Sequence, residues 1–407
     1  MPLFEHLQIT KPGERWLVGT ADLVLGAMSR IRSAISPSPP PSDPPRRILL
    51  LRLERIGDLL MTLDAIALVR RYAPAARIDL VVGSWNRDLA GLISCVDSVE
   101  TLDLPWMARE RPPRSWMGMT RQAWRWRSRH YDLAINFEPD IRSNMLLALS
   151  GATRRVGYSS SGGGDVLTES LASEPAAHVA ANAERLIARA FPLQSVRAQG
   201  VSDRDAACTL TIPENARRAA AVLIERNGLA GRPIVGLQTA AGRKVKEWDP
   251  VRFAEVGVEL TRARGVSVML IGSAHDRAAL SAVKAAWPSD VPLVELPVDT
   301  DLIGLAAMLE RLALLITGDT GPMHLAALVG TPIVAVFGPS LPSRYAPLSA
   351  RSTVVRIDLP CSPCNQMRHP PARCVGIVPD CLSGIQTAQV VRAAGDLLDR
   401  SAVNTPV

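Results

Sequence analysis

The sequence predicts an α/β fold with two Rossmann-like domains that face a central cleft. Two series of short apolar runs alternate with segments of helical spacing, one before and one after about residue 205. Buried strands that alternate with helices are typical of parallel sheets covered on both faces. A chain of 407 residues, 47% of them hydrophobic, is long enough to bury two such cores, which excludes disorder as its main state.

Each domain is expected to follow this alternation from its first strand. For the first domain, residues 46–204, the predicted elements are strands at 48–53, 78–82 and 131–137 and a helix at 59–72. For the second domain, residues 205–407, the predicted strands are 233–238, 266–271, 312–317 and 332–337.

Residues 1–45 form an N-terminal extension. Apolar and arginine residues between Trp16 and Ile35 have the spacing of an amphipathic helix. The proline-rich segment 36–45 predicts an extended linker, because proline fixes φ and removes an amide donor. No apolar run approaches the roughly 20 residues that cross a bilayer, and the start lacks a secretory signal pattern. We therefore expect a cytoplasmic protein.

The net charge of +7 favours an acidic partner. Nucleic acid, anionic lipid and a phosphorylated small molecule all satisfy this condition. The charge alone does not choose among them.

The loop after the predicted strand at 312–317 has the features of an anion site. It reads Gly318-Asp319-Thr320-Gly321-Pro322, and Pro322 suits the first turn of a helix that Gly330 can end. Amides at a helix N-terminus and the helix dipole favour a pyrophosphate. The alternative is an ordinary strand–turn–helix joint with Asp319 as a cap, and spacing alone leaves both open.

A second loop, Arg55-Ile56-Gly57-Asp58, joins the first predicted strand to its helix. Ligands of open α/β sheets collect at the carboxyl ends of strands, where this loop lies. Asp58 is a candidate general base for an attacking hydroxyl. The alternative, that Asp58 only caps the helix, is the commoner role of such a residue.

A third loop, residues 238–250, follows the first strand of the second domain. It carries Arg243, Lys244 and Lys246, which suit the phosphates of a nucleotide and the charge on a departing group. A solvated basic loop is the alternative. The position at the carboxyl end of a strand favours a functional role.

Taken together, these three loops resemble glycosyltransferase family 9. The resemblance rests on Gly57-Asp58 after a strand, on Lys246-Glu247-Trp248, and on the segment from Gly318 to His324, and it runs from about residue 48 through most of the chain. It implies the GT-B fold and inverting transfer of a sugar, usually heptose from ADP-heptose, to a lipopolysaccharide-core or related glycan. It implies no essential metal, and we expect no cofactor.

The resemblance also implies roles for individual residues. Asp58 matches the catalytic base, and Lys246 matches the contact to the donor phosphates. The expected donor-binding residues are Thr239, Arg243, Lys244, Asp276, Asp319, Thr320, Gly321 and His324. The expected acceptor-binding residues are Arg55, Gly57, Arg125 and Arg155. Asp276 stands where the family often has a glutamate that holds the ribose, so the nucleotide stays open.

Tryptophan and arginine alternate between residues 106 and 129. The residues are Trp106, Trp116, Trp124, Trp126, Arg109, Arg111, Arg114, Arg121, Arg125, Arg127 and Arg129. In a lipopolysaccharide enzyme they suit an anionic acceptor or the inner face of the inner membrane. Stacking on single-stranded nucleic acid and a plain surface helix are the alternatives. The glycines at 162–164, near Arg155, predict a mobile loop that closes over the acceptor.

Two further patterns suggest metals. Cys361, Cys364, Cys374 and Cys381 could bind zinc tetrahedrally, but their irregular spacing favours reduced thiols or a local disulfide. The pairs Asp203–Asp205 and Asp299–Asp301 have the spacing of metal-dependent transferases. Neither pair follows a clear apolar strand, so both are expected to be surface acids.

Two other functions compete with an enzyme. A catalytically inactive nucleotide-sugar-binding protein on the same scaffold would bind donor but would not need Asp58. A nucleic-acid-binding protein would bind oligonucleotides with an affinity that falls steeply with salt. We expect a nucleotide sugar and an anionic glycolipid or glycan as partners, and no nucleic acid.

Overall fold

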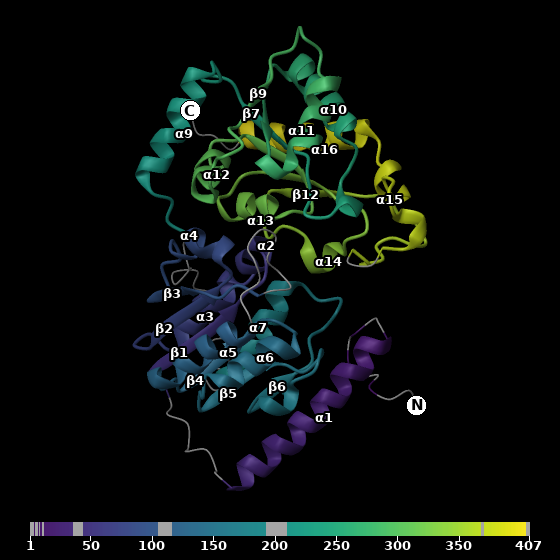
Figure 1. Ribbon diagram of the computed structural model, residues 1–407. Coiled ribbons are helices and arrows are strands. Elements are labelled where there is room, and N and C mark those ends of the chain that lie inside the picture. Colours follow the sequence, from purple (N-terminus) through teal and green to yellow (C-terminus); the bar gives the residue numbers. More distant parts are fainter. Residues whose placement is uncertain are drawn as a thin grey trace. The chain divides into compact units, whose positions relative to one another are not determined.

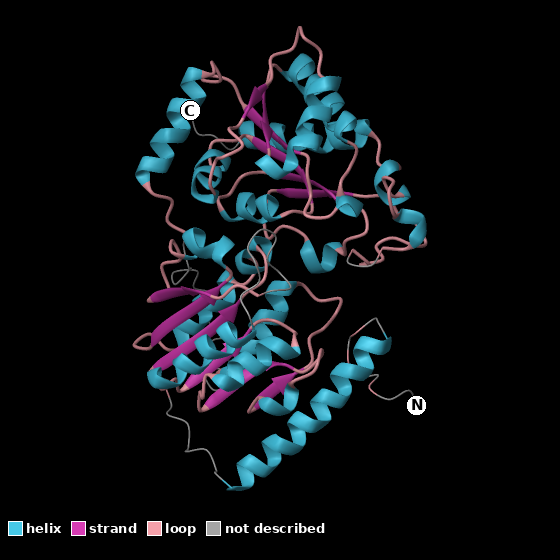
Figure 2. Ribbon diagram, in the orientation of Figure 1, coloured by secondary structure: helices cyan, strands magenta, loops and turns pink. Residues whose placement is uncertain are grey.

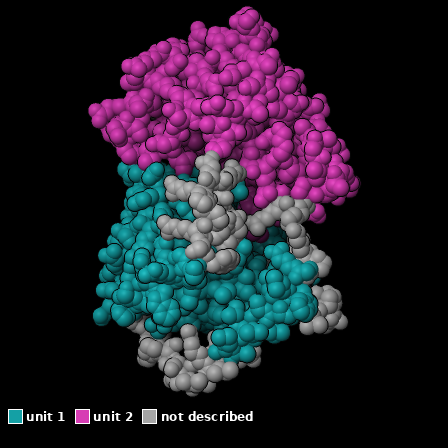
Figure 3. Space-filling model, viewed as in Figure 1, with its two compact units in different colours: residues 1–211 teal, residues 212–407 magenta. Residues whose placement is uncertain are grey.

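The computed structural model describes residues 4, 7, 9, 12–35, 44–104, 116–192, 210–367 and 370–403. The chain divides into two compact units, Met1–Thr211 (unit 1) and Ile212–Val407 (unit 2), which Figure 3 shows in two colours. The predicted domain boundary after residue 204 lies outside the described residues. Each unit contains helices and a parallel sheet, as Figure 2 shows.

The sheet of unit 1 is parallel throughout, in the order β3-β2-β1-β4-β5-β6. Its strands are β1 (Arg47–Arg52), β2 (Arg77–Val82), β3 (Ser98–Thr101), β4 (Leu133–Asn136), β5 (Arg154–Tyr158) and β6 (Glu169–Leu171). The three strands predicted from the sequence are confirmed as β1, β2 and β4. They were predictable because a central parallel strand is buried on both faces, as β1 is from Ile48 to Arg52.

The helices of unit 1 surround this sheet (Figure 1). They are α1 (Pro12–Ile35), α2 (Ile56–Leu60), α3 (Leu63–Tyr72), η1 (Ser84–Asn86), α4 (Arg87–Ala90), α5 (Trp116–Arg125), η2 (Trp126–Arg129), α6 (Ile141–Leu149), η3 (Gly164–Val166) and α7 (Val179–Ala190). The N-terminal helix predicted at 16–35 is present as α1. Among the described residues, no helix is both long and apolar enough to cross a membrane.

The single helix predicted at 59–72 is wrong, because two helices occupy this region. The Thr62 hydroxyl donates to the Asp58 carbonyl at 2.7 Å, and the Thr62 amide donates to the Leu59 carbonyl at 3.0 Å. The first helix therefore tightens and ends, and Thr62 becomes the N-cap residue of α3. This break confines Asp58 to the short helix α2.

One face of the unit 1 sheet is covered by α5, α6 and the segment that follows η3. Trp126, Leu147 and Leu167 pack there against Leu49 and Leu51 of β1 in a single buried cluster. Burial of such side chains stabilises a fold by about 1.5–3 kcal/mol each. This layer packs against β1, whose carboxyl end leads into the loop that carries Asp58.

Unit 2 repeats the architecture with the parallel strand order β12-β11-β10-β7-β8-β9. Its strands are β7 (Ile234–Gln238), β8 (Ser267–Ile271), β9 (Val294–Glu295), β10 (Leu314–Gly318), β11 (Ile333–Val336) and β12 (Ser352–Val355). All four strands predicted for the second domain are confirmed, as β7, β8, β10 and β11. The Trp248 and Phe253 rings meet edge to face at 5.0 Å inside its core.

Along the chain, the helices of unit 2 precede, connect and follow these strands (Figure 1). They are α9 (Glu214–Arg226), η5 (Lys244–Lys246), α10 (Pro250–Arg264), η6 (Ala274–Asp276), α11 (Arg277–Ala286), α12 (Leu302–Leu309), α13 (Gly321–Leu328), α14 (Pro342–Tyr345), η7 (Ala372–Cys374), α15 (Asp380–Ser383) and α16 (Thr387–Val403). Strands β7 and β10 are neighbours, so the loops at their carboxyl ends lie side by side. The loops after β1 and β4 in unit 1 are related in the same way.

Candidate functional site

Asp58 lies in α2, directly beyond the carboxyl end of β1. Arg55, and not Asp58, is the N-cap residue of this helix, so the role proposed by the capping alternative belongs to another residue. Arg55 is exposed and Gly57 lies in the first turn beside Asp58. The Asp58 carboxylate is about a quarter exposed, and its Oδ1 lies 3.6 Å from Nη2 of Arg52. It is therefore accessible from solvent and held by a cation.

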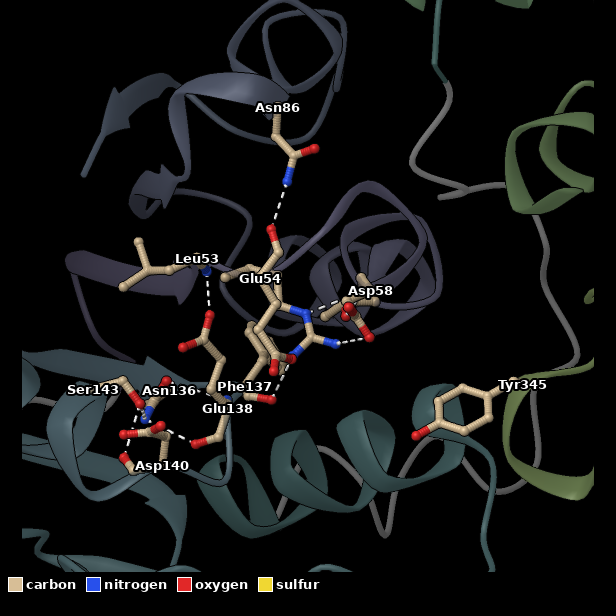
Figure 4. Close-up of polar contacts among 12 residues, drawn as sticks. Leu53, Glu54, Asp58, Asn86, Asn136, Phe137, Glu138, Asp140, Ser143 and Tyr345 are labelled. Atoms are coloured by element: carbon tan, nitrogen blue, oxygen red, sulfur yellow. Dashed lines mark hydrogen bonds and ion pairs between the residues drawn. The ribbon is translucent and has the colours of Figure 1, made fainter. Parts of the chain in front are cut away.

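Arg52 is a buried cation at the end of β1 that the sequence reasoning missed. Its side chain is only 2% exposed. Nε donates to the Asp58 carbonyl at 3.0 Å, and Nη1 donates to the Phe137 carbonyl at 2.8 Å and to Oε2 of Glu54 at 3.2 Å (Figure 4). Burial lowers the pKa of Arg52, but nearby carboxyl groups, Glu54 and Asp58 foremost, outweigh it and keep the pKa above its ordinary value. Arg52 thus fixes the Asp58 turn against the loop after β4.

Glu138 lies beneath this network, at the carboxyl end of β4. It accepts a hydrogen bond from the Leu53 amide, and its side chain is buried. Burial raises the pKa of Glu138 to about 8; the charge of Glu54 adds to the rise and Arg52 opposes it. At neutral pH Glu138 is therefore mostly protonated, which leaves Arg52 to pair with Glu54 and Asp58.

Polar contacts also hold the loop from Leu53 to Asp58 on a second side. Nε1 of Trp85 and Nδ2 of Asn86 both donate to the Glu54 carbonyl, at 2.9 and 3.0 Å. Asn86 is fully buried, and its Oδ1 has no hydrogen-bond partner within the described part of the chain. The loop is thus braced from both neighbours of β1.

In unit 2 the structure brings two of the predicted residues together. Lys246 ends η5 after β7, and Asp319 follows β10. Nζ of Lys246 lies 2.7 Å from Oδ2 of Asp319, and the two side chains are 17% and 9% exposed. A carboxylate beside an anion site would repel it, and this ion pair compensates that charge.

Hydroxyl groups gather next to the ion pair. Thr320 is the N-cap residue of α13, and its hydroxyl donates to Oε1 of Gln238 at 3.1 Å. Thr317 donates to the same oxygen at 2.7 Å. The Thr239 hydroxyl is buried and has no hydrogen-bond partner among the described residues. Because the first turn of a helix leaves amides without intrahelical acceptors, Thr239 and the start of α13 form a candidate anion site.

The other predicted donor residues have mixed environments. Lys244 is exposed and pairs with Glu247 at 2.6 Å, and Arg243 is the exposed N-cap residue of η5. Oδ2 of Asp276 accepts from the amide and hydroxyl of Ser273 at 2.8 and 2.7 Å, which forms a capping box. Gly321 begins α13, and His324 is buried within it. The ribose contact of Asp276 stays a prediction.

Two of the predicted acceptor residues, Arg125 and Arg155, lie in different environments. Arg125 is exposed at the end of α5, which leads through η2 into the amino end of β4, whereas Asp58 lies beyond the carboxyl end of the parallel strand β1. This placement does not support an acceptor contact beside Asp58. Arg155 is buried, and its guanidinium donates to the carbonyls of Ala152 and Val166 at 2.7 and 3.0 Å. This is the environment of a structural arginine and does not support an acceptor contact.

The glycine loop at 162–164 is tied down by hydrogen bonds. The Gly162 carbonyl accepts from Nδ2 of Asn144 at 3.0 Å, and the Gly163 amide donates to Oδ1 of Asp22 at 2.7 Å. These contacts bind the loop to α6 and α1. They do not support the predicted mobile loop over the acceptor.

The tryptophan and arginine segment separates into two kinds of residue. Trp126 is buried and donates to Oε2 of Glu100 at 3.0 Å. Trp124 is 58% exposed, and the Arg127 guanidinium lies 4.5 Å from its ring centroid. The predicted residues from 106 to 114 and the Trp116 side chain lie outside the described residues. The segment therefore keeps an exposed aromatic and basic side.

All four C-terminal cysteines line one cavity of about 540 Å³ in unit 2. Cys361, Cys364, Cys374 and Cys381 are unbonded thiols, which excludes a local disulfide in this structure. Burial raises the pKa of the Cys381 thiol. Among the described residues, no three or more histidine, cysteine, aspartate or glutamate side chains are arranged to hold a metal ion.

The two aspartate pairs have different outcomes. Oδ1 of Asp301 accepts from the Gly304 amide at 2.7 Å and caps α12, while Asp299 is exposed. This agrees with the expectation of surface acids for Asp299 and Asp301. The pair Asp203–Asp205 lies outside the described residues.

Comparison with known proteins identifies the family. The family model described as glycosyltransferase family 9 (heptosyltransferase) matches residues 119–373. Lipopolysaccharide heptosyltransferase 2 of Escherichia coli is 25% identical over 76% of this chain and 88% of its own length. Lipooligosaccharide heptosyltransferase 2 of Haemophilus influenzae is 23% identical with the same coverage.

Solved structures show the same fold. The structure of E. coli ADP-heptose lps heptosyltransferase II matches with a TM-score of 0.69 and 22% identity, covering 88% of this chain and 99% of that chain. A glycosyltransferase family 9 structure from Veillonella parvula matches with a TM-score of 0.70 and 24% identity, covering 87% and 97%. The two parallel sheets are thus those of the GT-B fold. On these grounds the chain belongs to glycosyltransferase family 9 and is a glycosyltransferase.

Proposed function

We propose that this protein transfers a heptose, or a related sugar, from ADP-heptose to a lipopolysaccharide-core or related glycan. The relatives are lipopolysaccharide and lipooligosaccharide heptosyltransferases, and a similar solved structure is that of an ADP-heptose enzyme. The observation that carries the proposal in this chain is the Lys246–Asp319 pair beside the start of α13. It combines a cation, a helix N-terminus and hydroxyl groups at the carboxyl edge of one sheet.

The proposed donor site uses these groups against the diphosphate. Lys246 and the positive end of α13 stabilise the negative charge that grows on the departing nucleotide diphosphate. Asp319 keeps Lys246 in place at 2.7 Å and accepts hydrogen bonds from hydroxyl groups of the sugar. The Thr239 hydroxyl donates to a phosphate oxygen, which gives this buried group the partner it lacks.

The proposed base is Asp58. It takes the proton from the acceptor hydroxyl while that oxygen attacks the anomeric carbon of the donor sugar. The bond from this carbon to the diphosphate breaks on the opposite face, so the configuration inverts. Arg52 positions the base through contacts to both its carboxylate and its carbonyl. The proposed reaction requires no metal ion, and Arg55, three residues before Asp58, is the proposed contact to an anionic acceptor.

The test is to incubate the full chain with ADP-heptose and a lipooligosaccharide that lacks heptose, with and without EDTA. We expect a product heavier by one heptose and release of ADP at equal rates in both samples. A catalytically inactive binding protein would bind ADP-heptose in calorimetry and form no product. That outcome, or transfer that EDTA abolishes, would contradict the proposal.

A glycolipid acceptor also implies a location. We place the protein in the cytoplasm with peripheral contact at the inner face of the inner membrane. Separation of a cell lysate into soluble and membrane fractions tests this placement. Recovery in the soluble fraction alone, at low salt, would contradict the membrane contact.

A further inference from the structure

Helix α1 presents its apolar side to solvent. A surface helix normally buries its apolar stripe and exposes its polar face. In α1 the large apolar side chains are instead more than half exposed: Trp16 (62%), Leu17 (65%), Leu23 (57%), Val24 (60%) and Met28 (61%). Spacings of seven residues (Trp16 to Leu23, Leu17 to Val24) and four residues (Val24 to Met28) place them on one side of the helix.

The opposite side of α1 is the one that docks on unit 1. Oδ1 of Asp22 accepts from the Gly163 amide at 2.7 Å. A Cβ atom at Gly26 would lie 2.0 Å from Oδ2 of Asp165, so a larger residue here would displace the Asp165 carboxylate. Val18 lies against Gly162, where an added Cβ would lie 2.6 Å from its Cγ1. A rotation of α1 that buried its apolar side would break these close contacts.

The exposed apolar side chains continue on neighbouring helices. Contacts link α1 to η3, η3 to α6, and α6 to α5, all on the face of the sheet that α5 and α6 cover. Met145 of α6 is 42% exposed, and Met117 and Trp124 of α5 are 78% and 58% exposed. Three helices in this chain of contacts, α1, α6 and α5, therefore each expose apolar side chains.

The same side carries positive charge. Arg121, Arg125 and Arg127 are exposed on α5 and the turn after it. The Arg127 guanidinium lies 4.5 Å from the centroid of the exposed Trp124 ring. Arginine and tryptophan together suit the boundary between lipid headgroups and acyl chains, where the ring is half buried and the guanidinium meets phosphate.

We propose that the apolar side of α1 and the exposed side of α5 form a docking surface for an anionic lipid bilayer. The inference rests on the proposed function in taking a glycolipid as the acceptor. Leu17, Val24 and their neighbours enter the acyl boundary, while the α5 arginines contact phosphate headgroups. An isologous dimer through this surface would place the same arginines on both sides, so the charge favours lipid over a second copy.

The experiment is flotation of the full chain with vesicles of phosphatidylcholine alone or mixed with phosphatidylglycerol. We expect the double substitution Leu17→Glu with Val24→Glu to weaken binding to mixed vesicles at least tenfold, because it removes two apolar side chains that enter the bilayer in the proposed complex. The double substitution Arg121→Gln with Arg127→Gln should weaken binding to mixed vesicles roughly tenfold and should change binding to neutral vesicles little. Val222→Glu, which adds a charge at a 43% exposed valine of α9, is the matched control and should bind as the native protein does.

Equal binding of the α1 variant and the Val222→Glu control would overturn the proposal. A native dimer in sedimentation velocity that the α1 variant converts to monomer, without a change in vesicle binding, would assign this surface to a second copy instead. All variants change exposed positions, and thermal unfolding checks that they remain folded. Transfer to a lipid-free glycan acceptor should be unchanged in each of them, so loss of vesicle binding and failure of the transferase proposal are measured separately.

Discussion

Replacing Glu138 by glutamine removes a titrating carboxyl group and keeps the side-chain oxygen that accepts from the Leu53 amide. In the native protein burial raises the pKa of Glu138 from 4.5 to about 8. Between these pH values the folded chain keeps a proton that the unfolded chain has lost. The free energy of unfolding that Glu138 contributes therefore falls as the pH rises through this window.

The magnitude follows from the size of the pKa change. At about 1.36 kcal/mol per unit, a rise of roughly 3.5 units corresponds to about 5 kcal/mol as an upper figure. Glutamine has no proton to lose, so the stability difference between Glu138→Gln and the native protein should grow in favour of the variant from about pH 4.5 to about pH 8. Taking the difference between the two proteins cancels the titration of other groups.

Urea unfolding at several pH values, followed by tryptophan fluorescence, measures this difference. Asp88→Asn, at an exposed carboxylate of α4, is the matched control and should differ from the native protein by a constant amount. The two units can unfold separately, so the comparison uses the transition of unit 1. A Glu138→Gln effect that does not change with pH would refute the assignment of a buried, protonated carboxyl group.

Three further substitutions test other parts of the site. Arg52→Gln should lower the free energy of unfolding by about 1–3 kcal/mol, because it leaves the Asp58 and Phe137 carbonyls without their charged donor; an unchanged free energy in urea unfolding would contradict this. Lys246→Ala should weaken ADP-heptose binding roughly tenfold or more in calorimetry, since Asp319 is left unpaired near the diphosphate, and Lys246→Arg should recover part of the affinity. An unchanged dissociation constant would remove Lys246 from the donor site. Thr239→Val should leave stability within about 1 kcal/mol, because the hydroxyl has no protein partner, yet weaken donor binding several-fold; equal binding would assign the hydroxyl no donor contact.

The central strands could be predicted from the sequence because strands that are buried on both faces consist of continuous apolar runs. β1 and β10 are examples, and the loops that follow them were found by their position. The break at Thr62 could not be predicted from spacing. It depends on a side-chain hydrogen bond to the Asp58 carbonyl, which competes with the helix ladder.

The pairing of site residues depended on tertiary structure. Leu53 and Glu138 are 85 residues apart and meet only because β1 pairs with β4. Arg52 at the end of an apolar run was the available signal for a buried ionic network. Similarly, Lys246 and Asp319 meet because β7 pairs with β10, which the sequence order of the strands does not give.

The orientation of α1 on unit 1 also could not be predicted from the spacing of its apolar residues. Helical spacing identifies an apolar side but does not say whether that side faces the protein. Here the side of α1 that carries Gly26 and Asp22 contacts the segment around Gly163 and Asp165. Likewise, spacing did not separate the buried Trp126 from the exposed Trp124.

The rate of ADP release by Asp58→Asn is the decisive measurement for Asp58 as the base of the proposed sugar transfer. The assay uses saturating ADP-heptose and acceptor, with donor affinity measured separately by calorimetry. We expect the rate to fall roughly 10²–10⁴-fold with donor affinity nearly unchanged, because the amide keeps the shape of the side chain but cannot take a proton. A native rate in Asp58→Asn would contradict the claim.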